Sequence, residues 1–188
     1  MQILNIKNIE FEKQGKILFK IEKLSINTGD IIGLIGKNGS GKTTLLKYID
    51  DLLKDENNIS SEFLEFGENS LLKKSGGEVV VNKIRGSLLS NVEIYLLDEP
   101  STYLDYNNAN KIANLIKRTP ATFCIASHDR NFLNNVCTKL WIIENTTVRE
   151  FNGNYHEYKF QEEIETTEYE AELQKYNKET KKIKKSIQ

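Results

Sequence analysis

Glycine, lysine and threonine recur at fixed spacing in the stretch GKNGSGKT, residues 36–43. It matches the pattern GxxxxGK[ST] at every fixed position and lies between an apolar run and a helical one. Its glycines allow backbone N–H groups to turn toward a phosphate, and a helix start adds partial positive charge. Lys42 can bridge phosphate oxygens, and the Thr43 hydroxyl can ligate Mg²⁺. The predicted nucleotide-binding residues are Gly36, Asn38, Gly39, Ser40, Gly41, Lys42, Thr43 and Thr44.

Two acids follow a second apolar run, "IYLL", and a histidine comes just after a third, "TFCIAS". Asp98 is placed to hold Mg²⁺ through a water. Glu99 is placed to orient or deprotonate a water for in-line attack on a γ-phosphate. Ligands of open α/β sheets bind where strands end, so we expect His128 to contact the same γ-phosphate. The predicted chemistry is hydrolysis of a γ-phosphate with Mg²⁺, with Glu99 and His128 as the catalytic residues.

A second glycine-rich stretch, "KSGGE", lies further along the chain. Ser75, Gly76, Gly77 and Glu78 are a poor opening for a buried helix, because adjacent glycines weaken it. They suit a backbone that approaches an anion closely. The sequence therefore raises the question of why one domain carries two loops that face phosphate.

Apolar runs and helical patterns alternate along most of the chain. Strands are expected at residues 1–12, 17–26, 30–36, 92–100, 121–127 and 139–144. Helices are expected at residues 42–53, from residue 76, and at residues 107–118 and 130–137. This alternation predicts an α/β fold with a mainly parallel core sheet.

The 188 residues are 38% hydrophobic and 28% charged, with a net charge of −1. Such a chain can bury one good core and is ordinary for a globular protein. Cys124 and Cys137 lack metal-ligand spacing, and Cys124 is expected to be a buried apolar residue. No apolar run approaches the roughly 18 residues that span a bilayer. We expect a cytoplasmic protein with no membrane partner.

The composition changes near residue 155, where a long charged helix is expected. Its seam has heptad spacing and comprises Tyr169, Leu173, Tyr176, Thr180, Ile183 and Ile187. Six lysines lie near the end, at positions 175, 178, 181, 182, 184 and 185. Two interpretations stay open: a solvated helix face, or one arm of a helical hairpin whose basic side meets RNA phosphates.

The motifs "GKNGSGKTT", "SGGE", "YLLDEPSTYLD" and "SHD" follow one another in this order. The order resembles the nucleotide-binding domain of ABC ATPases over about residues 1–155. The resemblance implies an ABC-type fold with N-terminal antiparallel strands, and two such domains that enclose ATP between them. The partner is then a second ABC domain, either the C-terminal half of a longer protein or a second copy, and hydrolysis requires this pairing.

The resemblance also assigns roles to further residues. The loop of Ser75, Gly76, Gly77 and Glu78 would act on the ATP of the opposite domain, which answers why two loops exist, and Asp105 would belong to the D-loop. An aromatic residue is expected to stack on adenine, and Phe11 is the candidate; its alternative is a place in the core.

The segment "SHDRNFLNNVCTKLWIIEN" followed by "FNGNYHEY" is similar to the ABC-F class, which acts on ribosomes. "KSGGEVVVNKIRG" resembles the first domain of Vga-type ribosomal protection proteins. This implies an ATPase domain at 1–155, the start of a coiled-coil interdomain linker at 156–188, and the ribosome with its rRNA as partner. The implied function is resistance to lincosamides, pleuromutilins and streptogramin A.

Some features depart from the family pattern or favour other functions. No glutamine occurs between Gln14 and Gln161, so Phe66 or a neighbour replaces the usual Q-loop glutamine, and Tyr103 replaces the usual D-loop asparagine. A non-catalytic, ATP-dependent interaction module is therefore one alternative. Another is the ATPase subunit of a transporter, although the short gap between Lys42 and Ser75 leaves only a reduced helical subdomain.

Overall fold

The computed structural model describes residues 1–56, 59–66, 77–102 and 104–186. The chain divides into two compact units, Met1–Asn154 and Tyr155–Gln188. The first unit contains the sheet and the helices that cover it. The second is a single long helix, which is described separately below.

Among the described residues, eight strands form one sheet in the order β1-β2-β8-β7-β3-β6-β5-β4. The strands are β1 (Gln2–Lys13), β2 (Lys16–Asn27), β3 (Ile31–Gly36), β4 (Ser61–Glu65), β5 (Ile94–Asp98), β6 (Thr122–Ala126), β7 (Lys139–Glu144) and β8 (Thr147–Asn152). The central pairs β7-β3, β3-β6, β6-β5 and β5-β4 are parallel, whereas β1-β2 and β8-β7 are antiparallel. The predicted parallel core with N-terminal antiparallel strands is confirmed.

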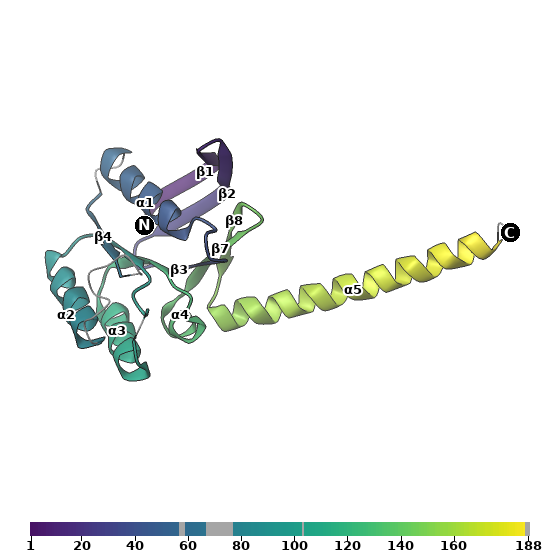
Figure 1. Ribbon diagram of the computed structural model, residues 1–188. Coiled ribbons are helices and arrows are strands. Elements are labelled where there is room, and N and C mark those ends of the chain that lie inside the picture. Colours follow the sequence, from purple (N-terminus) through teal and green to yellow (C-terminus); the bar gives the residue numbers. More distant parts are fainter. Residues whose placement is uncertain (57–58, 67–76, 103, 187–188) are drawn as a thin grey trace. The chain divides into compact units, whose positions relative to one another are not determined.

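Helices cover both faces of this sheet (Figure 1). On one face lies α1 (Lys42–Asp51), which continues into a π-helical turn, η1 (Leu52–Glu56). On the other face α2 (Gly77–Ser87), α3 (Tyr106–Arg118) and α4 (Arg130–Val136) gather together, and a 3-10 turn, η3 (Leu88–Ser90), follows α2. The parallel strands are therefore covered on both sides, as such sheets require.

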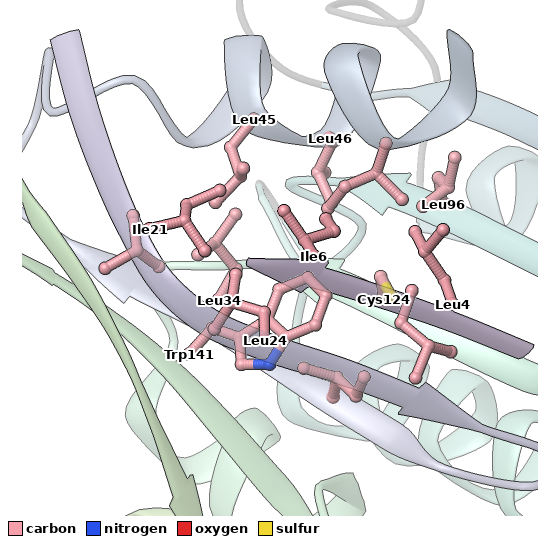
Figure 2. Packing of buried hydrophobic residues seen from close by; sticks show 14 of the residues in the cluster. Leu4, Ile6, Ile21, Leu24, Leu34, Leu45, Leu46, Leu96, Cys124 and Trp141 are labelled. Carbon is pink, nitrogen blue, oxygen red and sulfur yellow. The ribbon is translucent and has the colours of Figure 1, made fainter. Parts of the chain in front are cut away.

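The main hydrophobic core lies between α1, the β1-β2 hairpin and the central strands. Figure 2 shows Leu45 and Leu46 of α1 above Leu34 and Trp141 of the sheet. All four residues are completely buried. Every residue of β5 and β6 is buried, which matches their unbroken apolar sequence. This rigid centre holds the carboxyl ends of β3, β5 and β6 at one edge.

The long helix α5 (Tyr155–Ser186) makes up the second unit. Tyr169, Leu173 and Tyr176 of the expected seam are 66%, 47% and 67% exposed. The rest of that seam lies outside the side chains that the structure describes. The two interpretations of this helix, a solvated face or a hairpin arm, stay predictions.

Candidate functional site

The loop between β3 and α1 is shaped by glycines. Gly39 and Gly41 have φ angles of 76° and 97°, which other residues rarely adopt, and Gly41 caps α1. A Cβ atom on Gly41 would also lie 3.0 Å from Cγ of Leu18. A Cβ on Gly36 would lie 2.6 Å from Oγ of Ser40. These positions therefore require glycine for conformation or for space.

Lys42 is the first residue of α1, and its ammonium group turns back into the loop. Nζ donates to the carbonyl oxygens of Gly36 at 3.1 Å and Lys37 at 3.3 Å. Burial lowers the pKa of Lys42, and the carboxylates of Glu99 and Asp98 partly offset this effect. A buried ammonium group needs a partner of opposite charge, and a phosphate can be that partner. Asn38 and Thr44 lie in the same loop and in the first turn of the helix.

Thr43 and Asp98 are joined directly. The Thr43 hydroxyl donates to Oδ2 of Asp98 at 2.7 Å, across the space between α1 and the end of β5. Burial raises the pKa of Asp98, the Thr43 hydrogen bond opposes the shift, and the nearby Glu65 carboxylate adds to it. The two residues expected at the magnesium site are thus neighbours.

These residues fit a magnesium ion that is also bound by phosphate. Within the described residues, no group of three histidine, cysteine or acidic side chains could hold a metal alone. Magnesium commonly takes one or two carboxylates together with substrate phosphates. Thr43 and Asp98 provide a hydroxyl and a carboxylate, and the buried Oγ of Ser40 has no hydrogen-bond partner in the described structure. The donors therefore suit a metal that arrives with a nucleotide.

Glu99 and His128 meet at the same sheet edge. Glu99 follows β5 with φ of 57°, and Nε2 of His128 lies 3.0 Å from its Oε1. This is a close approach rather than an aligned hydrogen bond, because Oε1 is buried and without one in the described structure. Oε2 accepts from the Thr102 hydroxyl at 3.1 Å and from the His128 backbone at 3.3 Å. The carboxylate is thus fixed through Oε2, and its Oε1 lies beside the His128 ring.

A buried pair of serines, which the sequence analysis missed, supports this arrangement. The hydroxyl groups of Ser101 and Ser127 are 2.6 Å apart and join the loops after β5 and β6. Ser127 also accepts from the backbone of Asp129, which caps α4. Serines directly after two apolar strands were the available signal, but only the fold shows that they meet.

The second glycine-rich loop is described only in part. Ser75, Gly76 and Tyr103 lie outside the described residues. Gly77 begins α2 and Glu78 is exposed beside it. Asp105 caps α3, where its Oδ1 accepts from the backbone of Asn108 at 2.7 Å. A Cβ atom on Gly77 would lie 2.5 Å from Nδ2 of Asn108, so this asparagine joins the starts of α2 and α3.

Phe11, the candidate for adenine stacking, packs in an aromatic cluster. Its ring stacks on Phe19 at 4.8 Å between centroids and meets the edge of Tyr48 at 5.4 Å. Phe11 is half-buried and packed against the core. These contacts favour the alternative in which Phe11 is a core residue, and its role toward adenine stays a prediction.

The region of the missing glutamine contains Glu65 and Phe66. Phe66 is 4% exposed, and Nζ of Lys83 lies 4.6 Å above its ring. Its backbone N–H donates to the carbonyl of Asp98 at 2.9 Å. Phe66 therefore packs on the sheet, and at its neighbour Glu65 the described part of this region carries a carboxylate. No helix among the described residues is long and apolar enough to cross a membrane.

Comparisons with known proteins agree with this geometry. A family model described as "ABC transporter" matches residues 19–71. The chain is 32% identical to the ribosome protection protein VmlR of Bacillus subtilis (strain 168), over 97% of the chain and 39% of that protein. It is 30% identical to a probable ATP-binding cassette sub-family F member 3 homolog of Encephalitozoon cuniculi (strain GB-M1), over 88% of the chain and 36% of that protein. The chain thus spans well under half the length of both relatives.

The fold is also similar to that of solved proteins. A nucleotide-free ATP-binding cassette from an ABC transporter aligns with a TM-score of 0.66 and 21% identity. That alignment covers 81% of the chain and 92% of the solved structure. At this level of identity the likeness concerns the fold alone.

Proposed function

Because this chain belongs to the ATP-binding cassette ATPases, in their ABC-F class, we propose that it binds ATP with Mg²⁺ and hydrolyses it to ADP and phosphate. The observation that carries the proposal is the meeting of four functional groups at one sheet edge. These are the Lys42 ammonium group, the Thr43–Asp98 pair, the Glu99 carboxylate and the His128 ring.

Each residue has a separate role in the proposed reaction. Lys42 and the backbone N–H groups of the glycine loop bind the phosphates. Glu99 orients the attacking water and accepts its proton, and His128 contacts the γ-phosphate while it positions Glu99. Mg²⁺, held by Thr43 and through water by Asp98, would neutralise charge that develops on the phosphate oxygens.

The nucleotide and the hydrolysis can be tested on the chain itself. Lys42→Ala is expected to abolish nucleotide binding. Glu99→Gln is expected to keep binding and to lower phosphate release by about 10²-fold or more. Glu93→Gln is the matched control, because Glu93 lies at the opposite end of β5 from the site. If Glu99→Gln hydrolyses ATP as fast as the unchanged chain, the non-catalytic interaction module becomes the better proposal.

We further propose that hydrolysis requires a second ABC domain, because the loop with Ser75, Gly76, Gly77 and Glu78 would complete the site of a partner. Phosphate release per molecule is then expected to rise with protein concentration if two copies pair. Ser75→Arg should keep ATP binding and block ATP-driven pairing. A rate per molecule that stays constant over a wide concentration range, in a chain that hydrolyses ATP, would contradict the pairing.

The proposed biological role is protection of the ribosome against antibiotics of the lincosamide, pleuromutilin and streptogramin A classes. The support is the similarity to a ribosome protection protein, of which the chain spans only part. The first test is co-sedimentation of Glu99→Gln with purified ribosomes in the presence of ATP. Lys42→Ala is the control, and equal sedimentation of both variants would contradict a role that depends on ATP.

A further inference from the structure

Glu65 ends β4 next to the residue expected at the magnesium site. β4 and β5 pair in parallel, and in this register Glu65 is the direct partner of Asp98. Partner residues on neighbouring strands are about 5 Å apart. Glu65 therefore lies one strand away from the end of β5, at the edge where the functional groups meet.

The alternation of side chains along β4 places Glu65 on the face covered by α1. Nζ of Lys47, on α1, lies 5.4 Å from the ring centre of Phe63 and 3.5 Å from Oε2 of Glu65. Phe66 instead lies beneath Lys83 of α2, on the opposite face. The Asp98 side chain also faces α1, because it accepts the hydrogen bond from Thr43. Glu65 and Asp98 thus share a face as well as a register.

The contact between Lys47 and Glu65 is weak enough to be exchanged. The two side chains are 54% and 35% exposed, and their charged atoms are 3.5 Å apart. Ion pairs of this exposure contribute little to stability. Lys47 lies one helical turn beyond Thr43, so this ammonium group and the expected metal lie on the same side of α1.

We propose that Glu65 is a second carboxylate for the magnesium that accompanies the nucleotide, and that Lys47 competes with the metal for it. The inference rests on the proposed ATP binding and names a residue of that site which the sequence analysis did not assign. Magnesium keeps several waters and takes one or two carboxylates beside substrate phosphates. Asp98 is one of them, and Glu65 acts on the same ion through its water shell.

The test is the affinity of Mn²⁺, a spectroscopic substitute for Mg²⁺, for the chain saturated with ADP, measured by electron paramagnetic resonance. Glu65→Ala is expected to weaken Mn²⁺ binding by about 10-fold, the lower end of the effect of groups that support metal ligands. Lys47→Met is expected to strengthen it. Loss of folding cannot produce these opposite changes.

Two further variants separate this inference from general electrostatics. Glu62→Ala is the matched control, because Glu62 lies on the same strand and accepts from the Ser90 hydroxyl at 2.6 Å. It should leave Mn²⁺ affinity unchanged. In a Lys47→Met/Glu65→Ala double variant, the gain from Lys47→Met should disappear. If Lys47→Met strengthens binding equally with and without Glu65, the competition is wrong.

The outcomes also distinguish this inference from the proposed function. A chain that binds ADP and Mn²⁺ normally after Glu65→Ala overturns the role of Glu65 and leaves the ATPase proposal in place. If the chain without any substitution binds no nucleotide at all, the ATPase proposal and the role of Glu65 are both wrong.

Discussion

Replacing Gly77 with alanine provides a quantitative test of how α2 and α3 pack. Gly77 begins α2, and a Cβ atom there would lie 2.5 Å from Nδ2, 3.0 Å from Cγ and 3.1 Å from Cβ of Asn108. A rotation of the Asn108 amide would relieve only the first of these contacts, because Cβ does not move with it. We therefore expect the two helices to shift apart in Gly77→Ala.

The Asn108 side chain cannot easily move away. It is 8% exposed, and its Nδ2 donates to Oδ2 of Asp105 at 3.3 Å. Its Oδ1 accepts from Nζ of Lys111 at 3.1 Å. A shift of the amide would break these contacts in a buried place, where unpaired polar groups are costly.

The expected magnitude follows from two opposing effects. Overpacking a well-packed site costs about 1–3 kcal/mol. Alanine in place of glycine in a helix contributes at most about 1 kcal/mol in the other direction. The net loss in the free energy of unfolding is therefore about 1–2 kcal/mol. An Asn108→Ala background removes the contacts with Nδ2 and Cγ and leaves only the 3.1 Å contact with Cβ, so Gly77→Ala should cost much less there.

Urea unfolding of the four proteins in this cycle measures the effect. Gly86→Ala is the matched control, because Gly86 is in the same helix and a Cβ atom there would meet nothing within 4 Å. This control should stabilise the chain by about 0.5–1 kcal/mol. The reasoning is refuted if Gly77→Ala, with Asn108 unchanged, is as stabilising as Gly86→Ala.

Three further predictions concern buried or catalytic groups. Asp98→Asn should raise the free energy of unfolding at pH 7, because burial disfavours the Asp98 carboxylate. Burial raises the Asp98 pKa, so the folded chain releases this proton at a higher pH than the unfolded chain does. As the pH rises above about 4, the contribution of Asp98 to the free energy of unfolding therefore falls. Urea unfolding at several pH values should show this fall in the unchanged chain and not in Asp98→Asn. Cys124 and Cys137 should react with a thiol reagent only after unfolding, because burial raises both thiol pKa values. His128→Ala should lower phosphate release by about 10²-fold with little change in ATP affinity, measured by single-turnover kinetics.

Much of the fold could be predicted from the sequence because its centre follows simple patterns. Strands β5 and β6 are buried on both faces and read as unbroken apolar runs. Strands β4 and β8 were not predicted, because they lack such apolar runs. β4 (SEFLE) has one buried residue, Leu64, and β8 (TVREFN) has only Val148, so neither has a strong apolar signal.

The candidate site was predictable where the chemistry is local in sequence. The glycine loop and the acids after β5 are contiguous motifs, and the expected neighbours Thr43 and Asp98 do meet. The membership in the ABC-F class, predicted from the resemblance of residues 127–145 and 151–158, is confirmed by the relatives. The Ser101–Ser127 pair and the place of Glu65 were not predictable, because they depend on which strands become neighbours.

The site also combines features that oppose stability, and this supports a functional origin for them. Lys42 and Asp98 are buried with pKa values shifted against their charged forms, and Glu99 has a positive φ that is costly for a side chain with a Cβ atom. None of these features improves packing, which β5 and β6 already provide. Strain and buried charge that coincide at one sheet edge are typical of sites selected to bind a ligand. It follows that substitutions of Asp98 and Glu99 should remove activity while they preserve or raise stability, whereas truncations in the strands should remove both.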